Sequence, residues 1–204
     1  MSVEIVFWDV DTQHDFIDAD GNLPVDDGAV IRPNLEKLTR FARRHGIPIV
    51  ASADAHPPGD PEFEEFGQHC KAGTPGQEKI DETTAEPNEV VDPERIMDQL
   101  RALEAGELAQ LIIEKEELDV FTEPVADTVL RELDPEHVYV YGVATEYCVL
   151  RTVRGIAERG YEQTFLTDAI RPVEEDAADE ALDEMEGAGA HPAETDEVLR
   201  ELEA

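Results

Sequence analysis

The chain has 204 residues and a formal net charge of −34 at pH 7. A chain of this length can bury a substantial core, and we expect a single domain over residues 1–204. The negative charge argues against sequence-independent binding to nucleic acid or to an anionic membrane surface. No uncharged apolar run approaches the roughly 20 residues of a membrane span, and the N-terminus lacks the zones of a signal peptide, so we expect a cytoplasmic protein.

Acidic residues occur along the whole sequence, whereas lysine occurs only at positions 37, 71, 79 and 115. This composition resembles that of proteins from salt-accumulating halophiles, in which salt screens the self-repulsion of the chain. An ordinary acidic cytosolic protein is the alternative. The two cysteines, Cys70 and Cys148, are too few for a disulfide framework, and we expect separate thiols.

Five short apolar segments are predicted to form strands, at residues 4–10, 47–53, 110–114, 137–143 and 163–167. Most are nearly continuous apolar runs, as expected of strands covered on both faces. Helical patterns lie between them, at 31–42 and 149–157, and each is followed by a turn that contains glycine. The alternation predicts an α/β fold with a doubly wound (Rossmann-like), mainly parallel sheet of five to six strands and helices on both faces.

Two stretches fit this alternation poorly. Residues 54–92 are rich in proline, glycine and acidic residues, and they are too long for an idle connection, so we expect a functional loop insert. The acidic C-terminal segment, about 173–204, is the second.

Reactive side chains follow the predicted strands. Asp11 follows the first strand, Lys115 the third, and Cys148 lies in the turn after the fourth. The carboxyl ends of parallel strands meet at one edge of a sheet, so these side chains are expected to converge. Each alone has a structural alternative: a capping aspartate, a surface lysine and a small core residue.

Together the three residues predict a cysteine nucleophile. Cys148 is expected in the first turn of a helix, where free amides and the helix dipole favour the thiolate. The amides of Cys148 and Ala144 would then form an oxyanion hole. In this hypothesis Asp11 accepts the thiol proton and Lys115 holds both anions in place.

A second cluster lies on the long insert: Asp54 and His56, one residue apart, and the later His69. Mixed carboxylate and imidazole ligands suit zinc, iron or manganese, and three protein ligands leave positions open for water or substrate. A polar loop with solvated histidines is the alternative.

In combination, these residues resemble the isochorismatase-like cysteine hydrolases, and within them the nicotinamidases (pyrazinamidases). The resemblance covers about residues 4–172. It depends on segments in a fixed order: VDTQHDF at 10–16, ASADAHPP at 51–58, HCKAGTPGQ at 69–77, IIEK at 112–115, GVATEYCV at 142–149 and TDAIRPV at 167–173.

The resemblance implies a role for each matching position. It makes Asp11, Lys115 and Cys148 a catalytic triad, and it makes the Val143-Ala144 peptide a cis bond that shapes the oxyanion hole. Asp54, His56 and His69 match a divalent-metal site that contacts the pyridine nitrogen of the substrate. Asp60 and Glu62 lie in the loop where some relatives have a further histidine, so either is a candidate for an additional ligand that reaches the metal directly or through water. Aromatic positions around the substrate match Phe16 and Phe66, with Phe121 near another, and Cys70 matches a cysteine that is not the nucleophile.

We therefore expect a metal-assisted amidohydrolase that converts nicotinamide to nicotinate and ammonia, with a divalent ion, zinc first, as cofactor. Its expected partner is a small-molecule amide, and the resemblance favours a homo-oligomer.

Another hydrolase of the superfamily, acting on a different amide, a ureido compound or a vinyl ether, is the nearest alternative. A non-catalytic metal- or ligand-binding protein and an acidic module for basic partners are others. The intact triad disfavours the former, and the dispersed charge disfavours the latter.

Overall fold

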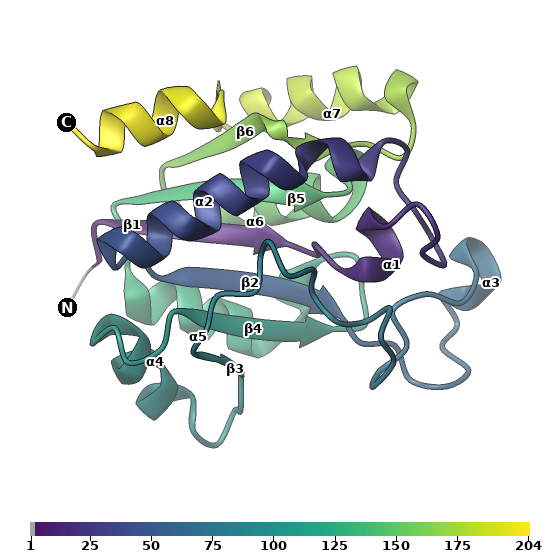
Figure 1. Cartoon of the computed structure of the whole chain (residues 1–204), viewed down its shortest axis with the longest axis horizontal. Coiled ribbons are helices and arrows are strands. Elements are labelled where there is room, and N and C mark those ends of the chain that lie inside the picture. Colours follow the sequence, from purple (N-terminus) through teal and green to yellow (C-terminus); the bar gives the residue numbers. More distant parts are fainter. Residues whose placement is uncertain (1–2) are drawn as a thin grey trace.

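The buried apolar runs of the sequence form the strands of one parallel sheet in the computed structural model, which describes residues 3–204 (Figure 1). The strand order is β3-β4-β2-β1-β5-β6-β7, and each neighbouring pair is parallel. The strands are β1 (Ile5–Val10), β2 (Ile49–Asp54), β3 (Asn88–Val90), β4 (Gln110–Lys115), β5 (His137–Val143), β6 (Gln163–Arg171) and β7 (His191–Ala193).

The predicted doubly wound α/β architecture is confirmed, but the sheet has seven strands, where five to six were expected. The two additional strands, β3 and β7, lie at the edges and have three residues each. They carry polar residues and a proline, so neither produces an apolar run in the sequence. The acidic segment 173–204 also continues the alternation, because it contains two helices and β7.

Helices cover both faces of the sheet (Figure 1). One layer packs α4, α5, α6 and α7 against Val6, Trp8 and Val10 of β1. The other packs α2 and α8 around Phe7. The helices are α1 (His14–Ile17), α2 (Arg32–His45), α3 (Phe63–Phe66), α4 (Ile96–Glu104), α5 (Pro124–Leu133), α6 (Leu150–Glu158), α7 (Glu175–Gly187) and α8 (Thr195–Leu202), with single turns η1 (Gly28–Ile31), η2 (Val120–Thr122) and η3 (Thr145–Val149).

Helix α2 illustrates how the sequence produces this packing. Leu35, Leu38 and Ala42 are spaced three to four residues apart, and all are fully buried against the sheet. Burial of each leucine contributes about 1.5–3 kcal/mol. The helix ends at Gly46, whose φ of 68° suits glycine and allows the chain to turn into β2.

The register of the central strands sets the positions of the residues at their carboxyl ends. Asp54 of β2 pairs directly with Lys115 of β4, so these two side chains start from neighbouring points. On the other side of β1, Gly142 pairs with Val10 at a φ of 124°, and a Cβ there would lie 2.0 Å from the Val10 carbonyl oxygen. Only glycine allows β5 to approach β1 this closely just before the cysteine turn.

The insert 54–92 is tied back to the end of β1. The amide of Ile80 donates to the Thr12 carbonyl, and the amide of His14 donates to the Glu78 carbonyl, each at 3.0 Å. The insert also contributes α3 and β3, so it is an ordered wall beside the sheet edge. Within residues 3–204, no helix is long and apolar enough to cross a membrane.

Candidate active site

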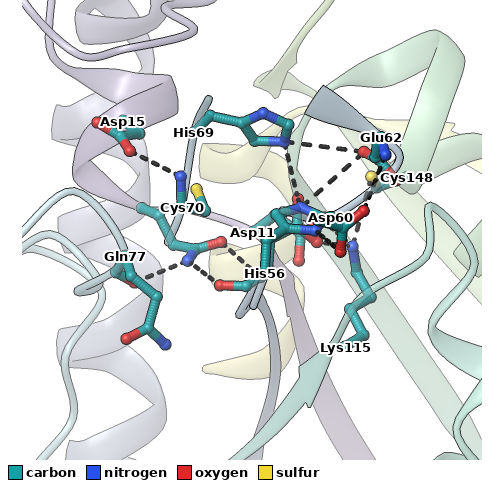
Figure 2. A network of polar contacts seen from close by, with 12 residues as sticks. Asp11, Asp15, His56, Asp60, Glu62, His69, Cys70, Gln77, Lys115 and Cys148 are labelled. Atoms are coloured by element: carbon teal, nitrogen blue, oxygen red, sulfur yellow. Dashed lines mark hydrogen bonds and ion pairs between the residues drawn. The ribbon is translucent and has the colours of Figure 1, made fainter. Parts of the chain in front are cut away.

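The ends of β1 and β4 bring Asp11 and Lys115 together in a fully buried ion pair. The Lys115 Nζ lies 2.9 Å from Asp11 Oδ2 and also donates to Asp54 Oδ1 (Figure 2). Asp11 lies just past β1 at a φ of 49°, a left-handed conformation that turns the chain out of the strand. Its other oxygen accepts a hydrogen bond from Ser52 Oγ at 2.7 Å.

Cys148 lies in the turn after β5, as expected, and its Sγ is 3.6 Å from Lys115 Nζ. This turn, η3, has a π-helical hydrogen-bond pattern and runs directly into α6. Wider turns of this kind occur often at functional sites. The Val143-Ala144 peptide bond is cis, and both residues line the same pocket as Cys148.

Burial dominates the protonation of the Cys148 thiol. Burial raises the pKa of Cys148 well above its usual value. The positive charge of Lys115 lowers this pKa, and the Asp11 carboxylate raises it further. The sequence predicted that the helix terminus would favour a resting thiolate. The structure instead favours a protonated thiol, because Cys148 is buried and its thiol faces the Asp11 carboxylate. To act as a nucleophile, such a thiol would need a nearby proton acceptor.

Asp11 is suited to accept that proton. Burial raises its pKa, Lys115 opposes the rise, and the nearby Asp54 carboxylate adds to it. Lys115 stays charged, since Asp11 and Asp54 raise its pKa well above its usual value although burial opposes them. A carboxylate with raised basicity, a fixed ammonium and a thiol thus share one dry site, an arrangement that can generate a thiolate on demand.

Asp54 joins this group to a second cluster on the insert. Its Oδ2 lies 3.7 Å from His56 Nε2 and 3.9 Å from His69 Nε2, and the three residues are nearly fully buried. Their donor atoms lie within 4.8 Å of one another, close enough for one metal ion to bind all three. The predicted metal ligands are therefore brought together.

The two acidic candidates for an additional ligand occupy different places. Glu62 Oε1 lies 3.9 Å from His56 Nε2 and 3.7 Å from His69 Nε2, so it faces the same space as the other donors (Figure 2). Asp60 instead contacts the opposite ring nitrogen of His56, Nδ1, at 3.1 Å. A carboxylate on the far nitrogen of a metal-binding histidine fixes the tautomer and orientation of its ring.

The donor set fits a divalent cation. His56 Nε2 is buried and has no hydrogen-bond partner, although buried polar atoms rarely lack one. The carboxylates of the cluster also favour positive charge on His56. Burial lowers the pKa of His56, but Asp54 and Asp60 outweigh burial and raise this pKa to about 9. Burial and the Asp54 charge raise the pKa of Glu62 to about 7. A cation at the centre would relieve this crowding of carboxylates, and imidazole with carboxylate is a ligand set that zinc accepts.

Both clusters open into one pocket of about 220 Å³, a size suited to a single-ring ligand. Phe16, Phe66, His69 and Cys148 line it, and Phe66 meets the Tyr147 ring edge-on at 5.6 Å. The remaining lining residues are Leu23, Val25, Asp54, Glu62, Leu118, Val143, Ala144, Tyr147, Val173 and Glu174.

Phe121, expected near the substrate, does not line this pocket. Its ring packs against Trp8 at 5.7 Å and lies beneath the Arg159 guanidinium at 3.9 Å. It also covers Gly155 of α6, where any Cβ would collide with the ring. The turn η2 directs Phe121 toward β1 and α6, where it is partly buried against the core, so the structure places it away from the pocket that it was expected to line.

Sequence reasoning missed two buried residues that support the site. Ser52 binds Asp11, and Gln13 binds Asp54 twice, donating from Nε2 to its carbonyl and accepting at Oε1 from its amide, both at 2.8 Å. A hydroxyl inside the buried strand IVASAD and a glutamine two residues after Asp11 were the available signals, because a buried polar side chain needs a partner. Their partners come from a different strand, which the sequence does not reveal.

Comparison with known proteins agrees with this architecture. The isochorismatase domain model matches residues 6–97 and 92–197. The nicotinamidases of Saccharomyces cerevisiae and Escherichia coli are 28% and 29% identical, over 82% and 89% of this chain and 88% and 90% of their own lengths. The crystal structure of a pyrazinamidase from Pyrococcus horikoshii in complex with zinc superposes with a TM-score of 0.75 and 31% identity, over 94% of this chain and 99% of its own. The chain therefore belongs to the isochorismatase family and is a hydrolase.

Proposed function

We propose that this hydrolase cleaves a small aromatic carboxamide, nicotinamide first, into the carboxylic acid and ammonia. One observation carries the proposal: Cys148 lines the same pocket of about 220 Å³ as Asp54 and His69, two of the three clustered metal-ligand candidates. A nucleophile alone would suit many acyl compounds, whereas an adjoining metal site gives a reason to bind a ring with a basic nitrogen. The nicotinamidase and pyrazinamidase relatives support amide hydrolysis.

The first half-reaction assigns a role to each member of the triad. The thiol of Cys148 gives its proton to Asp11 while the sulfur attacks the carboxamide carbon. Lys115 offsets the negative charge of both groups during this transfer. The carbonyl oxygen becomes an oxyanion beside the Val143-Ala144 and Cys148 amides, and collapse of the intermediate expels ammonia, which takes the proton from Asp11.

The second half-reaction releases the acid. A water molecule gives a proton to Asp11 and attacks the thioester carbon, and the Cys148 sulfur then leaves and recovers that proton. Asp54, His56, His69 and Glu62 would hold a divalent ion, zinc being favoured by this donor set and by the zinc complex of the P. horikoshii relative. That ion would supply a Lewis-acidic contact for a ring nitrogen.

The test is ammonia release from nicotinamide by purified protein in high salt, with and without added zinc or manganese. We expect metal-supported release that Cys148→Ala abolishes while the circular dichroism spectrum stays unchanged. Cys70→Ala is the matched control, because Cys70 is the other buried thiol and should leave release intact. Release by Cys148→Ala near the parent rate would contradict the mechanism, and silence of the parent under all conditions would contradict nicotinamide as substrate.

A further inference from the structure

The charge of the pocket lining is of one sign. Asp54, Glu62 and Glu174 line it, and no lysine or arginine does so among the residues that the structure describes. The nearest buried ammonium, Lys115, is engaged by Asp11 and Asp54. A divalent ion in the proposed metal site would offset Asp54 and Glu62, which leaves the carboxylates farther out without a counter-charge.

An acidic groove adjoins the pocket and shares Glu62, Phe66 and Leu118 with it. The groove has a volume of about 540 Å³. Arg151 is its one basic lining residue in the described part of the chain, and its guanidinium is turned to the Tyr147 carbonyl at 3.1 Å. The acidic lining residues of the groove are Asp60, Glu62, Glu65, Glu116, Glu117 and Asp119.

The fold fixes Glu174 at the pocket. Glu146, two residues before Cys148, accepts the amides of Val173 and Glu174 at 2.9 and 2.8 Å, so the start of α7 is attached to the catalytic turn. Glu174 lines the pocket and Glu65 lines the adjoining groove, so the two carboxylates flank the site from different elements. In agreement with this placement, burial raises the pKa of Tyr147, which also lines the pocket, and Glu146, Glu174 and Glu65 raise it further.

We propose that Glu174 and Glu65 act as specificity determinants that exclude carboxylate-bearing ligands, so that the site takes uncharged carboxamides and expels its own acid product. The identity of the substrate and product rests on the proposed function. The preference for uncharged over anionic ligands depends only on the charges around the pocket. The two side chains take no part in the bond-breaking steps. They act on any anion that approaches Cys148, through space and subject to screening by salt.

The experiment uses two thiol reagents of nearly equal size, uncharged iodoacetamide and anionic iodoacetate. Each alkylates Cys148 when the thiolate displaces iodide, and peptide mass spectrometry separates this reaction from any at Cys70. The measured quantity is the ratio of the two alkylation rates. We expect Glu174→Gln and Glu65→Gln each to lower the parent ratio roughly two- to fivefold at low ionic strength, and the ratio to fall with added salt.

Two neighbours provide matched controls. Glu175→Gln and Glu64→Gln remove the same charge from the adjacent positions in the chain, but neither side chain lines the pocket or the groove. We expect both controls to keep the parent ratio within experimental error. A ratio unchanged by Glu174→Gln and Glu65→Gln, or lowered equally by the controls, would overturn the proposal.

Because the reagents need no particular substrate, this result is independent of nicotinamide hydrolysis. If Glu174→Gln and Glu65→Gln lower the ratio of alkylation rates but no ammonia is released, the exclusion of anions is supported and only nicotinamide as substrate is rejected. Where release occurs, equilibrium binding in the Cys148→Ala background adds a second readout: nicotinamide should bind more tightly than nicotinate, and Glu174→Gln should narrow that difference. Equal narrowing by Glu175→Gln would count against the proposal.

Discussion

At the scale of single residues, the pKa of Asp11 is set by opposing effects of burial and of neighbouring groups. Burial raises its pKa, whereas Lys115 and the hydrogen bond from Ser52 favour its ionised form. Only the ionised form can take the Cys148 proton. Activity should therefore be present above the raised pKa of Asp11 and be lost as the pH falls through it, at a higher pH than for an ordinary aspartate.

A pair of variants tests this assignment. Asp11→Asn should lower kcat/KM by about 10²–10⁴-fold, the usual contribution of a positioned proton acceptor. Ser52→Ala removes a hydrogen bond that lowers the Asp11 pKa, so it should retain activity but move the acidic limb of the pH profile to higher pH. The profiles are measured with saturating metal. If the acidic limb of the Ser52→Ala profile lies at the same pH as in the parent, the limb reports the titration of a group other than Asp11.

Gln13 is a positioning residue for the proposed metal site. It binds both backbone groups of Asp54 and also donates to the Gln77 carbonyl at 2.7 Å. We expect Gln13→Ala to weaken zinc binding by about 10–100-fold, as loss of supporting contacts around a metal does. Competition with a chromophoric chelator measures the Kd.

Gln110 provides the control for this prediction. It is equally buried and binds backbone in the same way, accepting from the Ala85 amide and donating to the Thr83 carbonyl, but at the start of β4. Gln110→Ala should destabilise the fold comparably and leave the zinc Kd within about twofold, because the affected backbone is not bonded to the ligands. Equal zinc affinities in the two variants would reject the positioning role.

At the scale of elements, the sequence predicted what depends on local pattern. Apolar runs identified β1, β2, β4, β5 and the start of β6, and the rule that ligands bind at strand ends located Asp11, Lys115 and Cys148. The edge strands lack such a pattern. The position of Phe121 depends on η2 packing against Gly155, and the partner of Gln13 depends on the register of β1 with β2. Contacts of this kind are set by tertiary structure and leave no local signal.

Asp9 and Lys79 form a buried ion pair that joins β1 to the insert. The Lys79 Nζ lies 2.9 Å from Asp9 Oδ2 and 2.9 Å from Thr12 Oγ1, and burial outweighs this pairing to raise the Asp9 pKa. We expect Lys79→Met to cost about 3–5 kcal/mol in unfolding free energy, because it leaves an unpaired carboxylate in the core.

The double variant Asp9→Leu with Lys79→Met distinguishes the pair from a simple packing effect. Replacing both charges with apolar groups removes the unpaired carboxylate, so the double variant should lose less stability than Lys79→Met alone. Urea unfolding at pH 7 measures both. Strictly additive losses would show that the charges do not interact in the folded state.

At the scale of the whole molecule, the dominant feature is charge. The chain has 50 acidic and 16 basic side chains, and several of the basic ones form exposed pairs such as Lys37 with Asp196 and Arg101 with Asp98. Salt weakens such pairs, each of which contributes only about 0–1 kcal/mol. It also screens the repulsion among the remaining carboxylates, which involves most of the surface.

Repulsion should outweigh pairing, because the acidic groups outnumber the basic ones by about three to one over the whole chain. We therefore expect the urea midpoint of unfolding to rise with KCl concentration, most steeply below about 0.5 M, where the Debye length changes most. Urea is used because it is uncharged and does not itself screen. Sucrose at matched osmolality is the control, since it favours the compact state without screening charge and should give a smaller rise. A midpoint that is constant or falls with KCl would show that the ion pairs dominate, and would remove the halophilic interpretation of the composition.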